Sequence, residues 1–243
     1  MGQARVVAVT SLALEARIAQ GTGVSVLCSH SSQLAGRLEA LIDRGASGVI
    51  SFGIAGGLAP GHAAGDCVIA TAVRTGNQVF PTDRVWSQNL LRAIPEAIHA
   101  DIVGSDVLVA NPGDKTRLHA ETGAATVDME SHIAAKVAHA RGVPFAVCRV
   151  VIDAAHRTLP PAAAVGLRPD GTPDLRAVLG SLLRNPLQLP DLIRTARDAE
   201  IAESELFRVR QYLGHGLGIA GLDPIPDGEV EPEGAALPLN AVA

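Results

Sequence analysis

The apolar run over 143–152 (VPFAVCRVVI) sets the tightest limit on how this chain folds. A strand that is apolar at nearly every position must be covered on both faces, as in the central sheet of an α/β domain. Shorter β-branched runs are found at 4–10, 24–28, 47–53, 66–74 and 100–110. Helical patterns separate them, for example the amphipathic stretch 32–44. The sequence therefore predicts a three-layer α/β/α sandwich with a central mixed sheet.

The composition and the hydrophobic pattern of the chain change after Asp153. Residues 157–174 are rich in Pro and Gly, and helical patterns follow at 174–183 and 190–213. We expect one domain over 1–218, in which 157–218 is a helical C-terminal part. The Pro/Gly-rich, acidic segment 219–243 is predicted to be a loose tail.

Composition and motifs exclude several classes of function. Lys and Arg total 20 against 25 Asp and Glu, so a globally basic nucleic-acid binder is excluded. The three cysteines lack metal-ligand spacing, and no metal site or disulfide framework is predicted. No apolar run approaches the ~20 residues of a membrane span, so we expect a cytoplasmic protein. Dinucleotide, P-loop, α/β-hydrolase and HExxH signatures are absent.

Three acidic residues stand at or just after predicted strand ends, namely Glu15, Glu130 and Asp153. In open α/β sheets, ligands bind beyond the carboxyl ends of the strands. The glycine-rich stretch after Phe52, which we expect to be a turn, lets a ligand approach the backbone closely. These features predict a carboxylate-lined site at this edge of the sheet.

Five segments resemble the nucleoside phosphorylase and nucleosidase superfamily in order and spacing. They are Thr10–Glu15, Ser51–Leu58 (SFGIAGGL), Gly104–Ala110 (GSDVLVA), Val127–Ser131 (VDMES) and Cys148–Asp153 (CRVVID). Together they span about residues 4–155. The run over 151–175 and the helical segments up to 218 are most similar to the hopanoid-associated branch, which is thought to cleave adenosylhopane.

The resemblance implies cleavage of an N-glycosidic bond through an oxocarbenium-like sugar. Asp153 would protonate the leaving purine at N7, and burial would raise its pKa for that task. Glu15 would activate the attacking water. Two ordinary alternatives stay open, because Asp153 also suits a helix N-cap and Glu15 a surface ion pair.

Further positions take binding roles by the same resemblance. Glu130 would hold the ribose hydroxyls, with Met129 packing on the sugar and Asp128 beside them. The glycine-rich wall and the base pocket would be formed by Gly53, Ala55, Gly56, Leu108 and Val109. An aliphatic Leu108 stands where family members often carry an aromatic ring, so the prediction there is an apolar pocket without ring stacking.

Some of these residues have ordinary interpretations as well. Glu130 suits the first turn of a helix, and Met129 suits a gap in the core. Arg149 interrupts an apolar strand, where an unpaired charge is costly. We expect it to pair with Glu130 or Asp153, the alternative being an exposed sheet edge.

The nucleophile is predicted to be water. Phosphorolytic relatives hold phosphate with an Arg and a Ser near the glycine-rich stretch, where this chain has Ser51 and Ile54. Arg17 and Ser11 are the candidates for a different phosphate site, with phosphate as co-substrate. No other cofactor is implied.

The predicted activity is release of adenine from a 5′-modified adenosine, above all adenosylhopane. The alternatives are a phosphorylase acting on the same substrate, a methylthioadenosine or adenosylhomocysteine nucleosidase, and a non-catalytic nucleoside-binding protein. The resemblance also implies a homo-oligomer. A lipid-linked substrate would require transient contact with a membrane surface through an apolar groove. Its candidate residues are Leu159, Leu167, Leu182, Leu183, Leu187 and Leu189, which alternatively pack a helical subdomain.

Overall fold

The computed structural model describes residues 6–29, 31–164 and 175–219, and within these ranges the strands form one eight-stranded mixed sheet. The strands are β1 (Val6–Thr10), β2 (Val24–Cys28), β3 (Gly48–Gly57), β4 (Cys67–Thr75), β5 (Gln78–Pro81), β6 (Ile98–Gly104), β7 (Thr126–Asp128) and β8 (Phe145–Asp153). Their order is β2-β1-β3-β7-β6-β4-β5, and β8 pairs with both β3 and β4. Because β3, β8, β4, β6 and β7 pair in a closed circuit, this part of the sheet curves back on itself.

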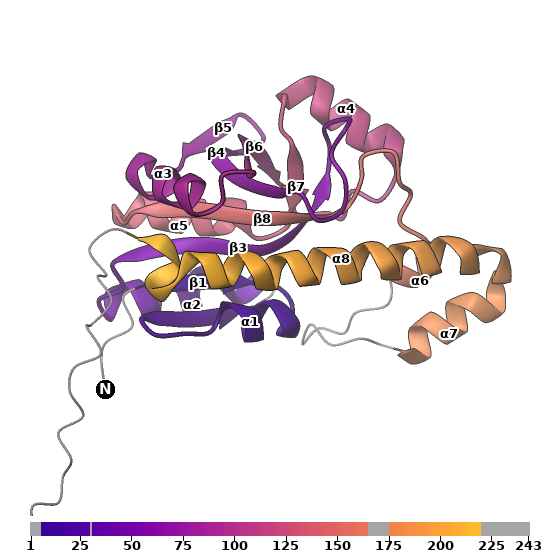
Figure 1. Ribbon diagram of the computed structural model, residues 1–243, viewed down its shortest axis with the longest axis horizontal. Helices are drawn as coiled ribbons and strands as arrows, with labels where there is room; N and C mark the ends of the chain where they lie inside the picture. The colour runs from indigo at the N-terminus through magenta and orange to yellow at the C-terminus, as the bar shows by residue number, and fades with distance from the viewer. Residues whose placement is uncertain (1–5, 30, 165–174, 220–243) are drawn as a thin grey trace, which may run out of the picture.

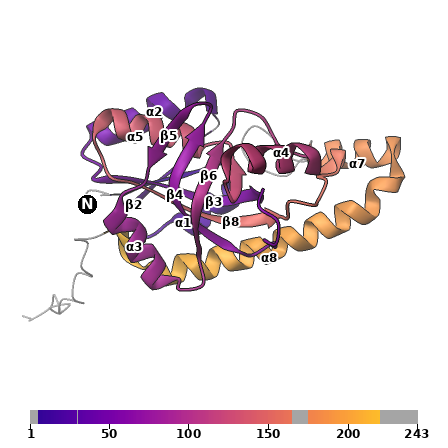
Figure 2. The ribbon, with the colours of Figure 1, turned by 90° about the horizontal axis from the view of Figure 1, so that it is seen from above.

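Helices cover both faces of the sheet (Figures 1 and 2). They are α1 (Ala13–Ala19), α2 (Ser31–Asp43), α3 (Arg84–Ala93), α4 (Pro112–Thr122), α5 (Ser131–Arg141), α6 (Pro161–Ala164), α7 (Leu175–Arg184) and α8 (Leu189–Leu213). Short 3₁₀ turns occupy Pro186–Gln188 and His215–Gly218. One buried cluster joins the sheet to α2 and α5, and a second joins it to α1, α3 and α8. The predicted three-layer architecture is confirmed.

Strand β8 shows why the apolar run forms the centre of the fold. Val147 and Val151 belong to the cluster with α2 and α5, whereas Cys148 and Val150 belong to the cluster with α3 and α8. Successive side chains of a strand point to opposite faces, so an apolar run can be buried on both sides. All four of these side chains are fully buried.

The predicted turn after Phe52 was wrong. Strand β3 continues to Gly57, pairing in parallel with β8 and, at its last two residues, antiparallel with β7. The glycines of this strand allow other side chains to approach its backbone closely. At Gly53 these are the side chains of Glu15 and Arg149. The predicted strand over 100–110 was too long, because β6 ends at Gly104.

The C-terminal part has two different environments. Ala202, Leu206 and Val209 of α8 are buried against the sheet. The first turns of α8 extend past the sheet and carry α7 at their far end (Figure 1). No helix of the described ranges has the length and apolar character needed to cross a membrane. The predicted tail falls outside the described residues, apart from Ile219.

Candidate active site

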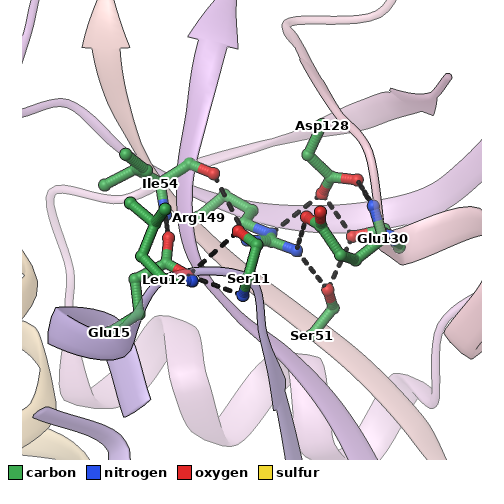
Figure 3. A network of polar contacts seen from close by, with 9 residues as sticks. Ser11, Leu12, Glu15, Ser51, Ile54, Asp128, Glu130 and Arg149 are labelled. Carbon is green, nitrogen blue, oxygen red and sulfur yellow. Dashed lines mark hydrogen bonds and ion pairs between the residues drawn. The ribbon is translucent and has the colours of Figure 1, made fainter. Parts of the chain in front are cut away.

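Glu15 lies in the first turn of α1, directly after β1, and its carboxylate is buried. Its Oε2 accepts hydrogen bonds from the backbone N–H groups of Ser11 (2.8 Å) and Leu12 (2.9 Å) and from the Ser11 hydroxyl (3.2 Å). Its Oε1 accepts one from Ile54 N–H (2.8 Å) on β3 (Figure 3). The alternative of an exposed surface Glu is excluded, because the residue is only 1% exposed.

Gly53 is the point on β3 against which this carboxylate rests. A Cβ placed there would lie 2.3 Å from Glu15 Oε1 and 2.7 Å from Arg149 Nη1, and the backbone φ is +153°. No L side chain fits that space without displacing both groups. Gly53 therefore permits an acidic and a basic side chain to meet at one position of the strand.

Arg149 of β8 is fully buried and joins the acidic residues of the site (Figure 3). Its Nη2 donates to Ser51 Oγ (2.6 Å) and lies 3.5 Å from Glu130 Oε2. Its Nε lies 2.8 Å from Asp128 Oδ2, at an angle unsuited to a hydrogen bond, so this contact is an ion pair. The predicted pairing with Glu130 is confirmed, whereas Asp153 has a different partner.

Asp128 and Glu130 stand at the junction of β7 and α5, with different surroundings. Asp128 accepts from the N–H groups of Glu130 (3.1 Å) and Ser131 (2.8 Å), which fixes the start of α5. Burial raises the pKa of Glu130 to about 7, against the opposing effect of the Arg149 cation. Glu130 therefore takes up or loses its proton near neutral pH.

Asp153, the last residue of β8, forms an ion pair with Lys115 of α4. The Lys115 side chain is fully buried, and its Nζ also donates to the carbonyls of Ala154 and Arg157, each at 3.2 Å. Burial raises the pKa of Asp153, and the Lys115 cation partly offsets that rise. The other oxygen, Oδ1, faces Gly56, where an added Cβ would lie 3.3 Å away.

The remaining predicted residues separate into two groups. Ala55 is buried, Met129 and Val109 are half-buried, and Leu108 is about half exposed on the loop after β6. Ser11 is part of the Glu15 cluster. Arg17 instead lines an outward-facing groove between α1 and α8, together with Leu14 and Phe207. The two candidate phosphate ligands are thus not brought together.

Sequence reasoning missed Lys115 and the role of Ser51. Lys115 lies in α4, a helix that was not predicted, although Asn111-Pro112 is a recognisable start. Asn111 indeed caps α4 by accepting from Asp114 N–H. A second signal was available, since Lys115 and Lys136 are the two lysines among 20 basic residues.

Fold and site together define an α/β enzyme with carboxylates gathered at the carboxyl ends of β1, β7 and β8. Residues 18–167 match the sequence profile of the Phosphorylase superfamily. The chain therefore belongs to the phosphorylase superfamily. Among curated proteins, no sequence matches the chain.

Solved structures of nucleosidases share the fold. The Helicobacter pylori 5′-methylthioadenosine/S-adenosylhomocysteine nucleosidase is 15% identical, with 88% of this chain and 97% of that chain covered and a TM-score of 0.63. The Colwellia psychrerythraea enzyme, in complex with adenine, is 16% identical (87% and 96% covered, TM-score 0.60). The S-adenosylhomocysteine nucleosidase of Streptococcus pyogenes is 16% identical (86% and 98%, 0.57). At these identities the likeness establishes the fold.

Proposed function

We propose that the chain is a nucleosidase that releases adenine from a 5′-modified adenosine, with water as the nucleophile. One observation carries the proposal. Two acidic side chains meet the same strand, Glu15 at Gly53 and Asp153 at Gly56, and their partners differ. Cleavage of a glycosidic bond needs two such groups in different roles.

Glu15 is the residue that we assign to the attacking water. Three backbone N–H groups hold its carboxylate in one orientation, so it is a fixed acceptor for a proton of water. Glu130 is assigned to the ribose hydroxyls, since a carboxylate accepts hydrogen bonds from a diol. Arg149 holds Glu130 in place through the contact at 3.5 Å.

Asp153 is the residue that we assign to the leaving base. A purine departs more readily when N7 receives a proton, and the raised pKa of Asp153 favours a carboxyl group that still carries one. The ordinary alternative, a helix N-cap, has no support in the structure, where Asp153 instead pairs with Lys115.

The surroundings of Glu15 favour water over phosphate. The neighbouring cation, Arg149, is already engaged by Asp128 and Glu130. An entering phosphate would meet the buried carboxylate of Glu15, and like charges at close range repel. Arg17 lies in the groove outside this cluster.

The activity is tested by following adenine release from adenosylhopane and from methylthioadenosine, without phosphate and then with it. The proposal predicts release in phosphate-free buffer and no acceleration by phosphate. Strict phosphate dependence would instead indicate a phosphorylase. Binding of adenosine analogues without turnover would indicate a non-catalytic binding protein.

We also propose that the chain belongs to the hopanoid-associated branch and contacts a membrane surface to reach its lipid-linked substrate. Leu183 and Leu187 are each 86% exposed at the end of the α7–α8 arm, and Leu179, Leu189 and Ile193 are exposed beside them. This exposure argues against packing of Leu183 and Leu187 inside a helical subdomain, whereas Leu159 and Leu182 are half-buried. Leu167 lies outside the described residues. Exposed leucines beside arginines such as Arg184 suit a shallow contact with anionic lipid.

Co-sedimentation with anionic vesicles tests the contact. We expect wild-type protein to sediment with vesicles and the L183S/L187S double variant to remain in solution, with unchanged turnover of methylthioadenosine. Concentration-dependent self-association without lipid binding would assign these leucines to contacts between copies of the chain.

A further inference from the structure

A buried lysine behind the proposed general acid is not explained by the proposed function alone. Lys115 is fully buried, and its Nζ has three acceptors, namely Asp153 Oδ2 and the carbonyls of Ala154 and Arg157. Three acceptors match the three N–H groups of an ammonium. Burying an ammonium is costly, so its retention at this position calls for a role.

We propose that Lys115 is a positioning residue that orients Asp153 and stabilises the carboxylate left after Asp153 has given its proton to the base. This inference rests on the assignment of Asp153 as general acid. Because Lys115 is enclosed behind Asp153, it acts through that carboxyl group and does not touch the substrate.

The two oxygens of Asp153 have separate tasks in this arrangement. Oδ2 faces Lys115, and Oδ1 faces Gly56 on the strand that also carries Gly53 and Ile54. Holding Oδ2 from behind leaves Oδ1 directed along the proposed sugar and base site. The Lys115 bonds to Ala154 and Arg157 fix the loop that follows β8, so the direction of the carboxyl group is set as well.

The step balances with the water of the proposed function as the other reactant, whose oxygen bonds the anomeric carbon while one of its protons passes to Glu15. The O–H bond of Asp153 breaks as an N–H bond forms on the base, and the electron pair of the glycosidic C–N bond passes to the base. Asp153 is left as a carboxylate, while Lys115 keeps its three protons throughout. The carboxyl group regains its proton from solvent after the base leaves, through a cavity of about 220 Å³ that Asp153 lines.

Other charges around Asp153 do not take the place of Lys115. Asp198 of α8 disfavours the carboxylate, and it lies 3.9 Å from Arg157. The remaining titratable groups that line the same cavity are His156, Asp191 and Arg194. Arg194 lies 3.2 Å from Asp191, so its charge is matched locally. Lys115 is thus the cation in direct contact with the Asp153 carboxyl group in the described part of the chain.

The pH profile of kcat/KM for base release separates this role from a purely structural one. In Lys115→Met, we expect the alkaline limb, which reports ionisation of Asp153, to move up by about one pH unit or more. The plateau rate should fall about tenfold or more, because a carboxylate then forms without a cation. Lys115→Arg keeps the charge and should keep the limb, and Lys136→Met on the exposed side of α5 serves as the matched control. An unmoved limb in Lys115→Met would overturn the proposal.

A second measurement does not depend on the folding of that variant or on activity. Labelling lysine with ¹⁵N at Nζ gives two side-chain signals, from Lys115 and Lys136. We expect the Lys115 signal of the wild-type protein to shift with the ionisation of Asp153, and Asp153→Asn to abolish that shift. A Lys115 signal that does not respond to Asp153→Asn would overturn the proposal. If Asp153→Asn left base release intact while the Lys115 signal of the wild-type protein still followed the ionisation of Asp153, the function assigned to Asp153 would fail separately.

Discussion

The two ends of the glycine-rich half of β3 hold carboxylates in opposite ways. At Gly53, Glu15 is fixed by backbone N–H groups from Ser11, Leu12 and Ile54. At Gly56, Asp153 is held by a single buried cation, Lys115. Backbone donors supply a constant environment, whereas burial raises the pKa of Asp153 and the Lys115 cation partly offsets that rise. The difference shows how a carboxyl group can serve as a proton acceptor at Gly53 and as an acid at Gly56.

The largest expected effect is at the acid end. Asp153→Asn removes the proton that the leaving base needs, so we expect kcat to fall by about 10³-fold or more. Stopped assays of adenine release measure this. Asp43→Asn, on the exposed side of α2, should retain wild-type rates. A wild-type kcat in Asp153→Asn would contradict the role of Asp153 as the acid, and with it the contrast between Asp153 at Gly56 and Glu15 at Gly53.

A somewhat smaller loss is expected at the acceptor end. In Glu15→Gln, the amide N–H₂ meets backbone donors and cannot take a proton from water, so kcat should fall about 10²-fold. The exposed Glu121→Gln of α4 is a suitable control. Full activity of Glu15→Gln would mean that another group activates the nucleophile.

The pH dependence of stability sharpens the comparison through Glu130, whose pKa is raised to about 7 from an ordinary 4.5. Between these values the folded chain retains a proton that the unfolded chain has released. Stability from this group is therefore full below about pH 4.5 and is lost as the pH rises through about 7. The loss is on the order of 3 kcal/mol.

Denaturant unfolding at pH 5 and pH 8 measures that loss. In Glu130→Gln this component should vanish, and KM should rise because the ribose loses an anionic acceptor. An identical pH dependence in the wild type and the variant would contradict the assignment.

The smallest expected effect concerns the contact point of Glu15. Gly53→Ala places a Cβ 2.3 Å from Glu15 Oε1, so the carboxylate must shift, and we expect stability to fall by ~1–3 kcal/mol. Gly36→Ala, on the exposed side of α2 with open space around its Cα, should be neutral or stabilising. Thermal unfolding of both variants measures the difference in stability. Equal stability of the two variants would show that Gly53 is not needed for the close approach of the Glu15 carboxylate to β3.

Local sequence patterns predicted the layers and left some of the site open. The apolar run before Asp153 predicted a sheet covered on both faces. The acidic residues that follow predicted strands indicated a site at the carboxyl edge of that sheet. The length of β3 was not predictable, because glycines usually end strands and only pairing with β8 and β7 extends this one. Lys115 was missed because its contact with Asp153 joins residues 38 positions apart.

Reaction in H₂¹⁸O, with phosphate present, is the most direct test of the roles assigned to Glu15, which activates water, and to Asp153, which protonates the base. Mass spectrometry of the released sugar and base follows the oxygen. We expect free adenine together with a sugar that carries ¹⁸O at the anomeric carbon. A sugar phosphate without the label would contradict it, because the nucleophile would then be phosphate and Glu15 would have no water to activate.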